Sequence, residues 1–342
     1  MMIDRNCLSQ LYDFSPETLA AFERQGLYHQ TFRFSRGEDA FILRISPPDE
    51  QAARLERKMV YLHALYQAGC PVIEPILSVN QHLVEAIPAA DGSVRLATVT
   101  RQAKGTTHEL LFPDSVPDRL FTEIGKKLAI LHDRSADLPV ADFAFSGWQD
   151  GENCFNAFNH QSFSDQRIVR KYLAYRDACL AYHESDHPAH RESDAVRAKA
   201  DRSFGIIHGD LHFSNIILDP NDCKVTFCDF DDACLGPHLM DLAMILFDLG
   251  VILQSDNKSH DLSKNVSRII DAYNQETTRD AVSLSEIHDF IKLLECSLYI
   301  QYYDDFQRSQ VANPQLASPT GWLELFFNGR KERILEDQPF LG

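Results

Sequence analysis

The chain has 342 residues, of which 44% are hydrophobic and 24% charged, a composition that excludes a disordered or fibrous protein. Its 33 Lys and Arg residues against 50 Asp and Glu leave a formal net charge of −17. Because this charge repels phosphates at long range, we expect neither a nucleic acid nor an anionic membrane as a partner. A small anion held by a few local cations is compatible with the same charge.

The sequence predicts a cytoplasmic protein. Its eight cysteines form no C-x-x-C pair, which favours reduced thiols over a structural zinc site. Residues 1–14 contain no apolar signal segment. The most apolar stretch, residues 242–253, is interrupted by Asp248 and is shorter than the ~18–20 residues of a membrane span.

The first hundred residues read as a mixed unit of helices and strands. Ser15-Pro16-Glu17 is typical of a helix start and predicts a short helix to about residue 25. A second helix is expected over residues 50–68, where apolar side chains recur with helical spacing before Gly69. Alternating patterns and turn residues predict strands at 28–34, 40–46, 76–79, 83–87 and 94–101.

From about residue 105 the pattern becomes mainly helical. Helices are expected at 117–134, 165–183, 238–253, 262–275 and 285–308, and short strands at 204–208, 216–218 and 224–229. The sequence therefore predicts an α+β protein with a small sheet-rich part followed by a larger helical part.

One segment carries recognisable chemistry. His208-Gly209-Asp210 is followed by Asn215, and Asp229-Phe230-Asp231 comes 14 residues later. Phosphoryl transfer needs a carboxylate that orients and deprotonates a hydroxyl, and we assign that role to Asp210. It also needs oxygen ligands for Mg²⁺, which Asn215 and Asp229 can supply. His208 is interpreted as loop scaffolding, while the role of Asp231 stays open between a metal contact and a solvated carboxylate.

This segment resembles the catalytic core of the aminoglycoside phosphotransferase and choline kinase family, which has a protein-kinase-like fold. Residues 231–243 are similar to the branch of homoserine-kinase-II-like and stress-response Ser/Thr kinases. The resemblance implies a bilobal fold, with a nucleotide-binding lobe of antiparallel sheet over residues 1–102 and a catalytic and acceptor-binding lobe over 103–342. It also implies that Asp241 begins a helix and holds the catalytic loop by hydrogen bonds.

The same resemblance assigns the nucleotide site. Arg44 stands where the family has a phosphate-anchoring Lys, and Glu56 on the following helix would be its partner. Residues 25–32 would form the loop that covers the nucleotide, and the strand 96–101 would present its backbone to the adenine. The implied cofactor-binding residues are thus Arg44, Glu56, Asn215 and Asp229, with ATP and Mg²⁺ as cofactors.

The resulting functional hypothesis is a phosphotransferase that moves the γ-phosphate of ATP to a hydroxyl of a small molecule, such as an amino alcohol or an aminoglycoside. A Ser/Thr protein kinase and a regulatory pseudokinase are the alternatives. A two-metal phosphoesterase would need a second His-rich cluster, which the chain lacks.

The acceptor pocket has one candidate in the sequence. A stripe formed by Tyr299, Tyr303 and Phe306, with Asp304 and Asp305, could surround a cationic acceptor. A helix buried on both sides explains the stripe as well, and we favour that interpretation.

Overall fold

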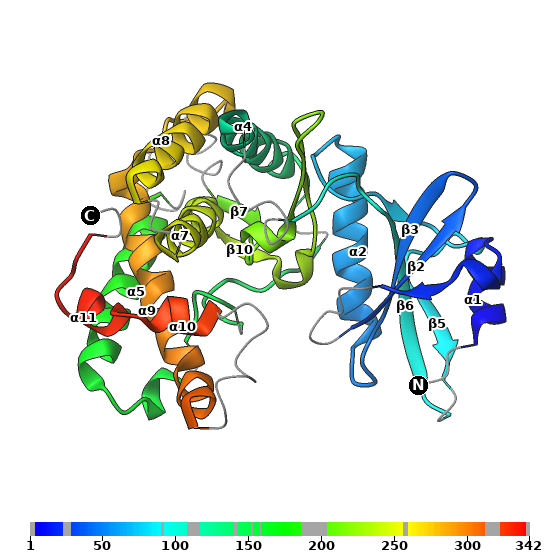
Figure 1. Ribbon diagram of the computed structural model, residues 1–342, viewed down its shortest axis with the longest axis horizontal. Coiled ribbons are helices and arrows are strands. Elements are labelled where there is room, and N and C mark those ends of the chain that lie inside the picture. Colours follow the sequence, from blue (N-terminus) through cyan, green and yellow to red (C-terminus); the bar gives the residue numbers. More distant parts are fainter. Residues whose placement is uncertain are drawn as a thin grey trace.

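The computed structural model shows two parts that lie side by side (Figure 1). The first contains a six-stranded sheet, and the second is mainly helical. The residues described are 4–22, 29–89, 92–107, 117–139, 143–151, 153–157, 159–186, 204–255, 259–311 and 322–339.

The sheet of the first part is antiparallel throughout. Its strand order is β1-β2-β3-β6-β4, and β5 also pairs with β6. The strands are β1 (Ala20–Ala21), β2 (Gln30–Arg36), β3 (Asp39–Ile45), β4 (Pro75–Ile76), β5 (Glu85–Pro88) and β6 (Val94–Arg101). Along β3, Phe41, Leu43 and Ile45 are buried, whereas Ile42 and Arg44 on the opposite face are half-buried. Arg44 is therefore available to the space between the two parts.

Helices cover the two faces of this sheet. The helix α1 (Arg5–Tyr12) packs on one face, where Phe14, Phe34 and Phe41 stack. The helix α2 (Ala52–Gln67) lies on the side of the sheet that faces the second part (Figure 1). A hydrogen bond joins the two parts of the chain here: Tyr61 Oη of α2 donates to the carbonyl oxygen of Ile206 at 3.3 Å.

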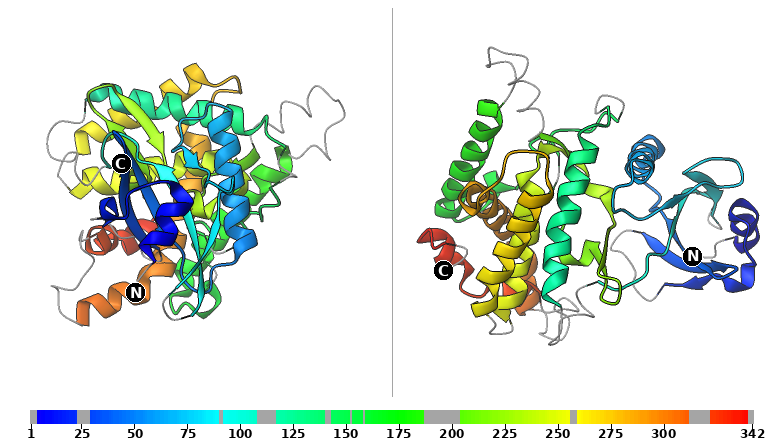
Figure 2. Two further views of the ribbon diagram at one scale, coloured as in Figure 1. Left: turned by 90° about the vertical axis from the view of Figure 1, so that its right-hand side faces the viewer. Right: turned by 90° about the horizontal axis from the view of Figure 1, so that it is seen from above.

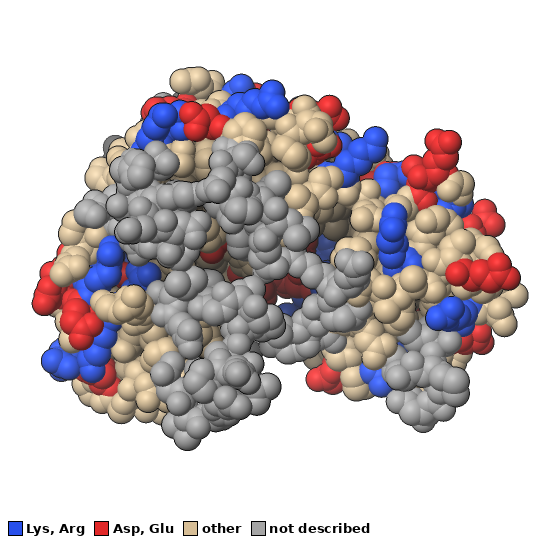
Figure 3. All heavy atoms as spheres, in the orientation of Figure 1, with Lys and Arg blue, Asp and Glu red and all other residues tan. Residues whose placement is uncertain are grey.

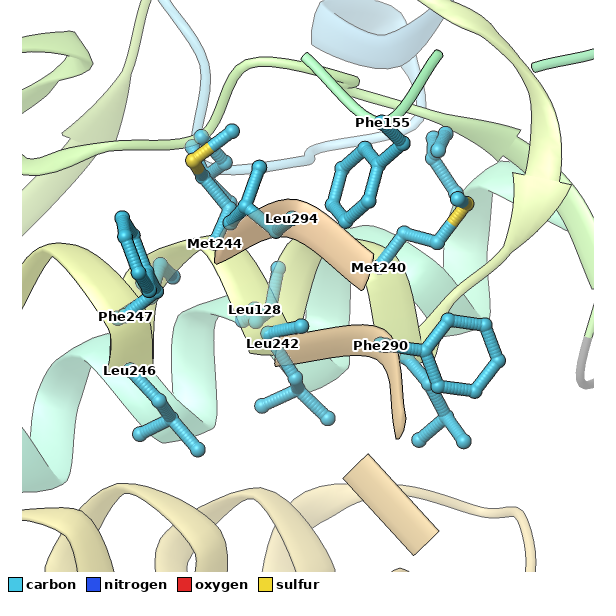
Figure 4. Packing of buried hydrophobic residues seen from close by; sticks show 14 of the residues in the cluster. Leu128, Phe155, Met240, Leu242, Met244, Leu246, Phe247, Phe290 and Leu294 are labelled. Atoms are coloured by element: carbon cyan, nitrogen blue, oxygen red, sulfur yellow. The ribbon is translucent and has the colours of Figure 1, made fainter. Parts of the chain in front are cut away.

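The second part is built around α7 (Leu239–Ser255), whose side chains are buried nearly all round. Met240, Met244 and Phe247 of α7 pack with residues of α4 and α9 in the apolar core shown in Figure 4. Two short antiparallel pairs, β7 with β10 and β8 with β9, complete this part beside the helices (Figure 2). The remaining elements are α4 (Asp118–Ser135), α5 (Gln166–Asp186), β7 (Phe204–Ile207), β8 (Ile216–Asp219), β9 (Lys224–Phe227), β10 (Cys234–Pro237), α8 (Ser259–Glu276), α9 (Leu284–Val311), α10 (Trp322–Phe327) and α11 (Arg330–Leu335).

The predicted helix over residues 15–25 is wrong. Over residues 15–22, the part of this range that the structure describes, the chain forms only a 3₁₀ turn at Pro16–Thr18, and Ala20 and Ala21 then pair with Arg33 and Phe32 of β2. Strand pairing satisfies these backbone groups, so the local helix-start signal is overridden. The other predicted helices and strands are found within a few residues of their predicted bounds, whereas α1, β10, α10 and α11 were not predicted.

Residues 23–28 lie outside the described residues, and they include the end of the predicted helix 15–25, the start of the predicted strand 28–34 and part of the predicted covering loop 25–32. All eight cysteines lie within the described residues and carry free thiols. Within the described part of the chain, no helix combines the length and the apolar character needed to cross a bilayer.

Candidate active site

The catalytic loop leaves β7 through a sharp turn at Gly209, which has φ +81°. A Cβ atom at this position would collide with the carbonyl oxygen of Asp232, so glycine is required both by conformation and by space. The turn directs the chain so that the next residue, Asp210, presents a side chain that is 25% exposed.

Asp241 anchors the start of this loop. Its carboxylate accepts hydrogen bonds from the amides of His208 (2.8 Å) and Gly209 (3.0 Å), and Nε2 of His132 lies 3.2 Å away. Burial favours the neutral carboxyl, but His132, His208 and the backbone donor outweigh it and lower the pKa of Asp241. Asp241 therefore begins α7 and holds the loop by hydrogen bonds, as predicted.

A second carboxylate of α7 holds the far end of the loop. Asp248 accepts a 2.7 Å hydrogen bond from the amide of Phe213 and is 92% buried, with 8% of its surface exposed. It follows Asp241 by seven residues, so both project from the same side of the helix. Sequence reasoning noted Asp248 only as a break in an apolar stretch. A charged residue two helical turns after Asp241 was the signal for this role.

The carboxylate of Asp210 is held between two donors. The thiol of Cys154 donates to Oδ1 at 3.2 Å, and His212 Nε2 lies 3.4 Å from Oδ2. Burial alone would raise the pKa of Asp210, but His212 and the Cys154 hydrogen bond outweigh it and lower that pKa. Asp210 is thus ionised at neutral pH and can accept a proton. Cys154 was not predicted, because it reaches Asp210 from a distant loop.

Asn215 and Asp229 lie on the β8–β9 hairpin beside Asp210. The side-chain nitrogen Nδ2 of Asn215 donates to the backbone carbonyl of Asp210 at 2.8 Å. The backbone amide of Cys228 donates to the backbone carbonyl of Asn215 at 3.0 Å. Asp229 has φ +66°, an uncommon backbone conformation for a non-glycine residue. An amide oxygen and a carboxylate are hard ligands, so this donor set fits a Mg²⁺ ion that completes its shell with water and phosphate oxygens.

The structure places Arg44 at this site but not with its predicted partner. Its guanidinium donates to Asp229 at 3.0 Å and to Asp231 at 2.7 Å, while Glu56 is exposed on α2. Burial favours the neutral Asp231, but Arg44 and His29 outweigh it and hold its pKa well below the usual range. The predicted Arg44–Glu56 pair is therefore wrong, because the carboxylates that bind Arg44 come from the second part of the chain.

The inward face of α2 explains this correction. At the helical repeat, Lys58 lies roughly 45° from the centre of the stripe formed by Leu55, Met59, Leu62 and Leu65, whereas Glu56 lies roughly 115° from it. Lys58 is accordingly 9% exposed. Applied strictly, the periodicity of the sequence would have shown that Glu56 points away.

The aromatic stripe of α9 belongs to the core. Tyr299 and Tyr303 meet the ring of Phe163, and Phe306 stacks on Phe327 with centroids 4.4 Å apart. Asp304 and Asp305 are exposed, so this end of α9 packs against the core along the aromatic stripe and faces solvent on its other side. Another residue of α9, Gln301, donates to the carbonyl of Asn153 at 3.0 Å and so supports the loop that carries Cys154.

Acidic groups surround the point where an acceptor hydroxyl would meet Asp210. The backbone of Asp232 lies against Gly209, the residue before Asp210. Burial, together with the charges of Asp210 and Asp231, raises the pKa of Asp232 to about 6. Figure 3 shows acidic and basic side chains at the bottom of the hollow between the two parts.

An antiparallel sheet joined to a helical part, with the Asp210 carboxylate beside Asn215 and Asp229 on neighbouring loops of the helical part, is the arrangement expected of a kinase-like phosphotransferase. Residues 22–264 match the model of the phosphotransferase enzyme family, and the chain belongs to that family. It is a phosphotransferase with the predicted α+β kinase-like fold.

The proteins that this chain is similar to match most of its length. The amicoumacin kinase of Bacillus subtilis (strain 168) is 23% identical over 274 residues, which cover 80% of this chain and 76% of that protein. An amicoumacin kinase solved with AMP-PNP, Ca²⁺ and Ami has a TM-score of 0.72 at 19% identity, covering 98% of this chain and 93% of its own. A microcompartment-associated aminopropanol kinase has a TM-score of 0.66 at 18% identity, covering 97% of both chains.

Proposed function

We propose that this protein transfers the γ-phosphate of ATP to a hydroxyl of a small molecule that carries an amino group. The observation that supports the transfer is the ionised Asp210, held between Cys154 and His212 within hydrogen-bond reach of Asn215. In this proposal Asp210 orients the acceptor hydroxyl and takes its proton. Asn215 and Asp229 would bind Mg²⁺, which neutralises charge on the transferred phosphate.

The amino group is proposed from charge. Asp210 of the catalytic loop and Asp232 of the turn at residues 230–232 lie near each other, and burial together with the negative charges of Asp210 and Asp231 raises the pKa of Asp232. An ammonium group on the acceptor would compensate this charge in a partly buried site. The name of the aminopropanol kinase among the similar structures is in keeping with an amino alcohol as substrate.

An acceptor screen tests the proposal. ADP release should be measured with Mg·ATP and matched acceptor pairs, for example aminopropanol against propanol, together with aminoglycosides and generic protein substrates. We expect release that depends on Mg²⁺ and on an amine-bearing alcohol. Release with protein acceptors alone would instead indicate a protein kinase, and ATP binding without any turnover would indicate a pseudokinase.

The finer assignments belong to the same proposal. They are a nucleotide-binding lobe over residues 1–102, a catalytic lobe over 103–342, a cytoplasmic location and a place near the homoserine-kinase-II-like branch. Arg44 is proposed to bind the phosphates, since its guanidinium already lies beside Asp229.

A further inference from the structure

The first part of the chain directs three basic side chains to the carboxylates of the second part. Arg44 of β3 binds Asp229 and Asp231, and His29 Nε2 lies 3.5 Å from Asp231. The third is Lys58 of α2, whose ammonium interacts electrostatically with Asp231 and Asp232. The helix α2 contacts the turn at residues 230–232, so these groups share one region.

Lys58 differs from the other two in having no direct partner. Among the residues described, none gives its ammonium a hydrogen bond or an ion pair within 4.0 Å, although 91% of the residue is buried and 9% exposed. Burial lowers the pKa of Lys58, while Asp231, Glu50 and Asp232 favour its charged form. The buried part of Lys58 is its apolar stem, whereas its ammonium reaches solvent, so the charged end is open to an anion.

The alternative, that Lys58 only neutralises Asp231, is less suited to the contacts. Asp231 already receives the Arg44 guanidinium at 2.7 Å and has His29 beside it. Lys58 makes no hydrogen bond or ion pair with Asp231, Asp232 or Glu50, the carboxylates whose charges act on it. Its ammonium can therefore bind a polyanion such as a nucleotide polyphosphate beside Arg44.

We propose that Lys58 is a phosphate-binding residue of the nucleotide site, where its ammonium and the Arg44 guanidinium together contact the polyphosphate chain of ATP. This proposal rests on the proposed use of ATP. It assigns two basic residues to the phosphates, one from β3 and one from α2. The carboxylate that holds Arg44 is then Asp231 rather than a glutamate of α2.

The test is equilibrium binding, measured by titration calorimetry with ATP, ADP and adenosine in the presence of Mg²⁺. Lys58→Met removes the charge and keeps the length of the side chain, and Lys58→Arg keeps a cation. Arg57→Met is the matched control, because it removes the same charge from the adjacent, exposed position. We expect Lys58→Met to weaken ATP about ten-fold or more, ADP less and adenosine not at all. Lys58→Arg should recover most of the loss, and the control should bind like wild type.

Two results would overturn the assignment: equal affinity of Lys58→Met and wild type for ATP, or an equal loss for ATP and adenosine, which indicates an effect on the fold. A wild-type protein that binds no ATP would instead refute the proposed function itself. If Lys58→Met does not fold, acylation of wild-type lysines followed by mass spectrometry provides the measurement. ATP should then protect Lys58 more than adenosine does, and equal labelling contradicts the proposal.

Discussion

Arg44 donates a 2.7 Å hydrogen bond to Asp231, which lies 187 residues further along the chain. This contact joins the sheet of the first part to the metal-site turn of the second. It brings a permanent cation to the segment that also carries Asp229, the carboxylate of the proposed Mg²⁺ site.

The first prediction measures this contact directly. In a double-mutant cycle of Arg44→Ala and Asp231→Ala, we expect a coupling of about 1 kcal/mol in the free energy of unfolding without nucleotide, since both side chains are partly exposed. Urea denaturation provides the values. The effects of Glu56→Ala and Arg44→Ala on the free energy of unfolding should be additive. A coupling between them as large as that between Arg44 and Asp231 would show that Arg44 and Glu56 do pair.

The second prediction concerns the proton acceptor. Asp210→Asn should lower kcat by ~10²–10⁴-fold, because the amide cannot take the proton of the acceptor hydroxyl. The affinity for ATP should stay near the wild-type value, since Asp210 is assigned to the acceptor. Steady-state ADP release and nucleotide titration separate the two effects. If Asp210→Asn retains most of the wild-type kcat, Asp210 is not the proton acceptor.

The third prediction concerns the metal. Asp229→Ala should abolish the increase in ATP affinity caused by Mg²⁺, because it removes carboxylate ligands. Thermal unfolding without ligands should change little, since the side chain is 43% exposed. Titrations of ATP with and without Mg²⁺ give the difference, and an unchanged metal effect would place the ion elsewhere.

The fourth prediction concerns stability and its dependence on pH. Asp241→Asn should cost about 3 kcal/mol or more, because three buried partners lose an ionised acceptor. The folded pKa of Asp241 is lowered, so its contribution is complete above the ordinary aspartate pKa of ~3.9 and is lost as pH falls through the folded value. Denaturation at several pH values should therefore show that the difference in the free energy of unfolding between wild type and variant becomes smaller in acid. A gap that widens there is incompatible with an ionised Asp241.

The fifth prediction concerns Asp232. Its pKa of about 6 means that it is mostly ionised at pH 7 and becomes neutral below pH 6. The KM for an amine acceptor should rise as the pH falls through this value, and in Asp232→Asn the rise should disappear. A matched alcohol without the amine is the control, and its KM should not follow the same profile.

The sequence alone was sufficient to predict that Asp210, Asn215 and Asp229 lie together, while their catalytic and metal-binding roles are proposals. Asp210, Asn215 and Asp229 are joined by a tight turn and a short hairpin, so the local chain path brings them together. Asp241 was also predictable, because the first turn of an apolar helix immediately follows the motif. Most strands and helices were correct for the same reason, since their patterns are local.

Only the tertiary structure decided which residues face the site from elsewhere in the chain. The partner of Arg44 depends on how the two parts meet, and Cys154 reaches Asp210 from a loop that Gln301 of α9 and Tyr172 of α5 help to hold. These choices depend on contacts between distant segments, and a local pattern of residue types contains no information on the side of the molecule that each segment will meet.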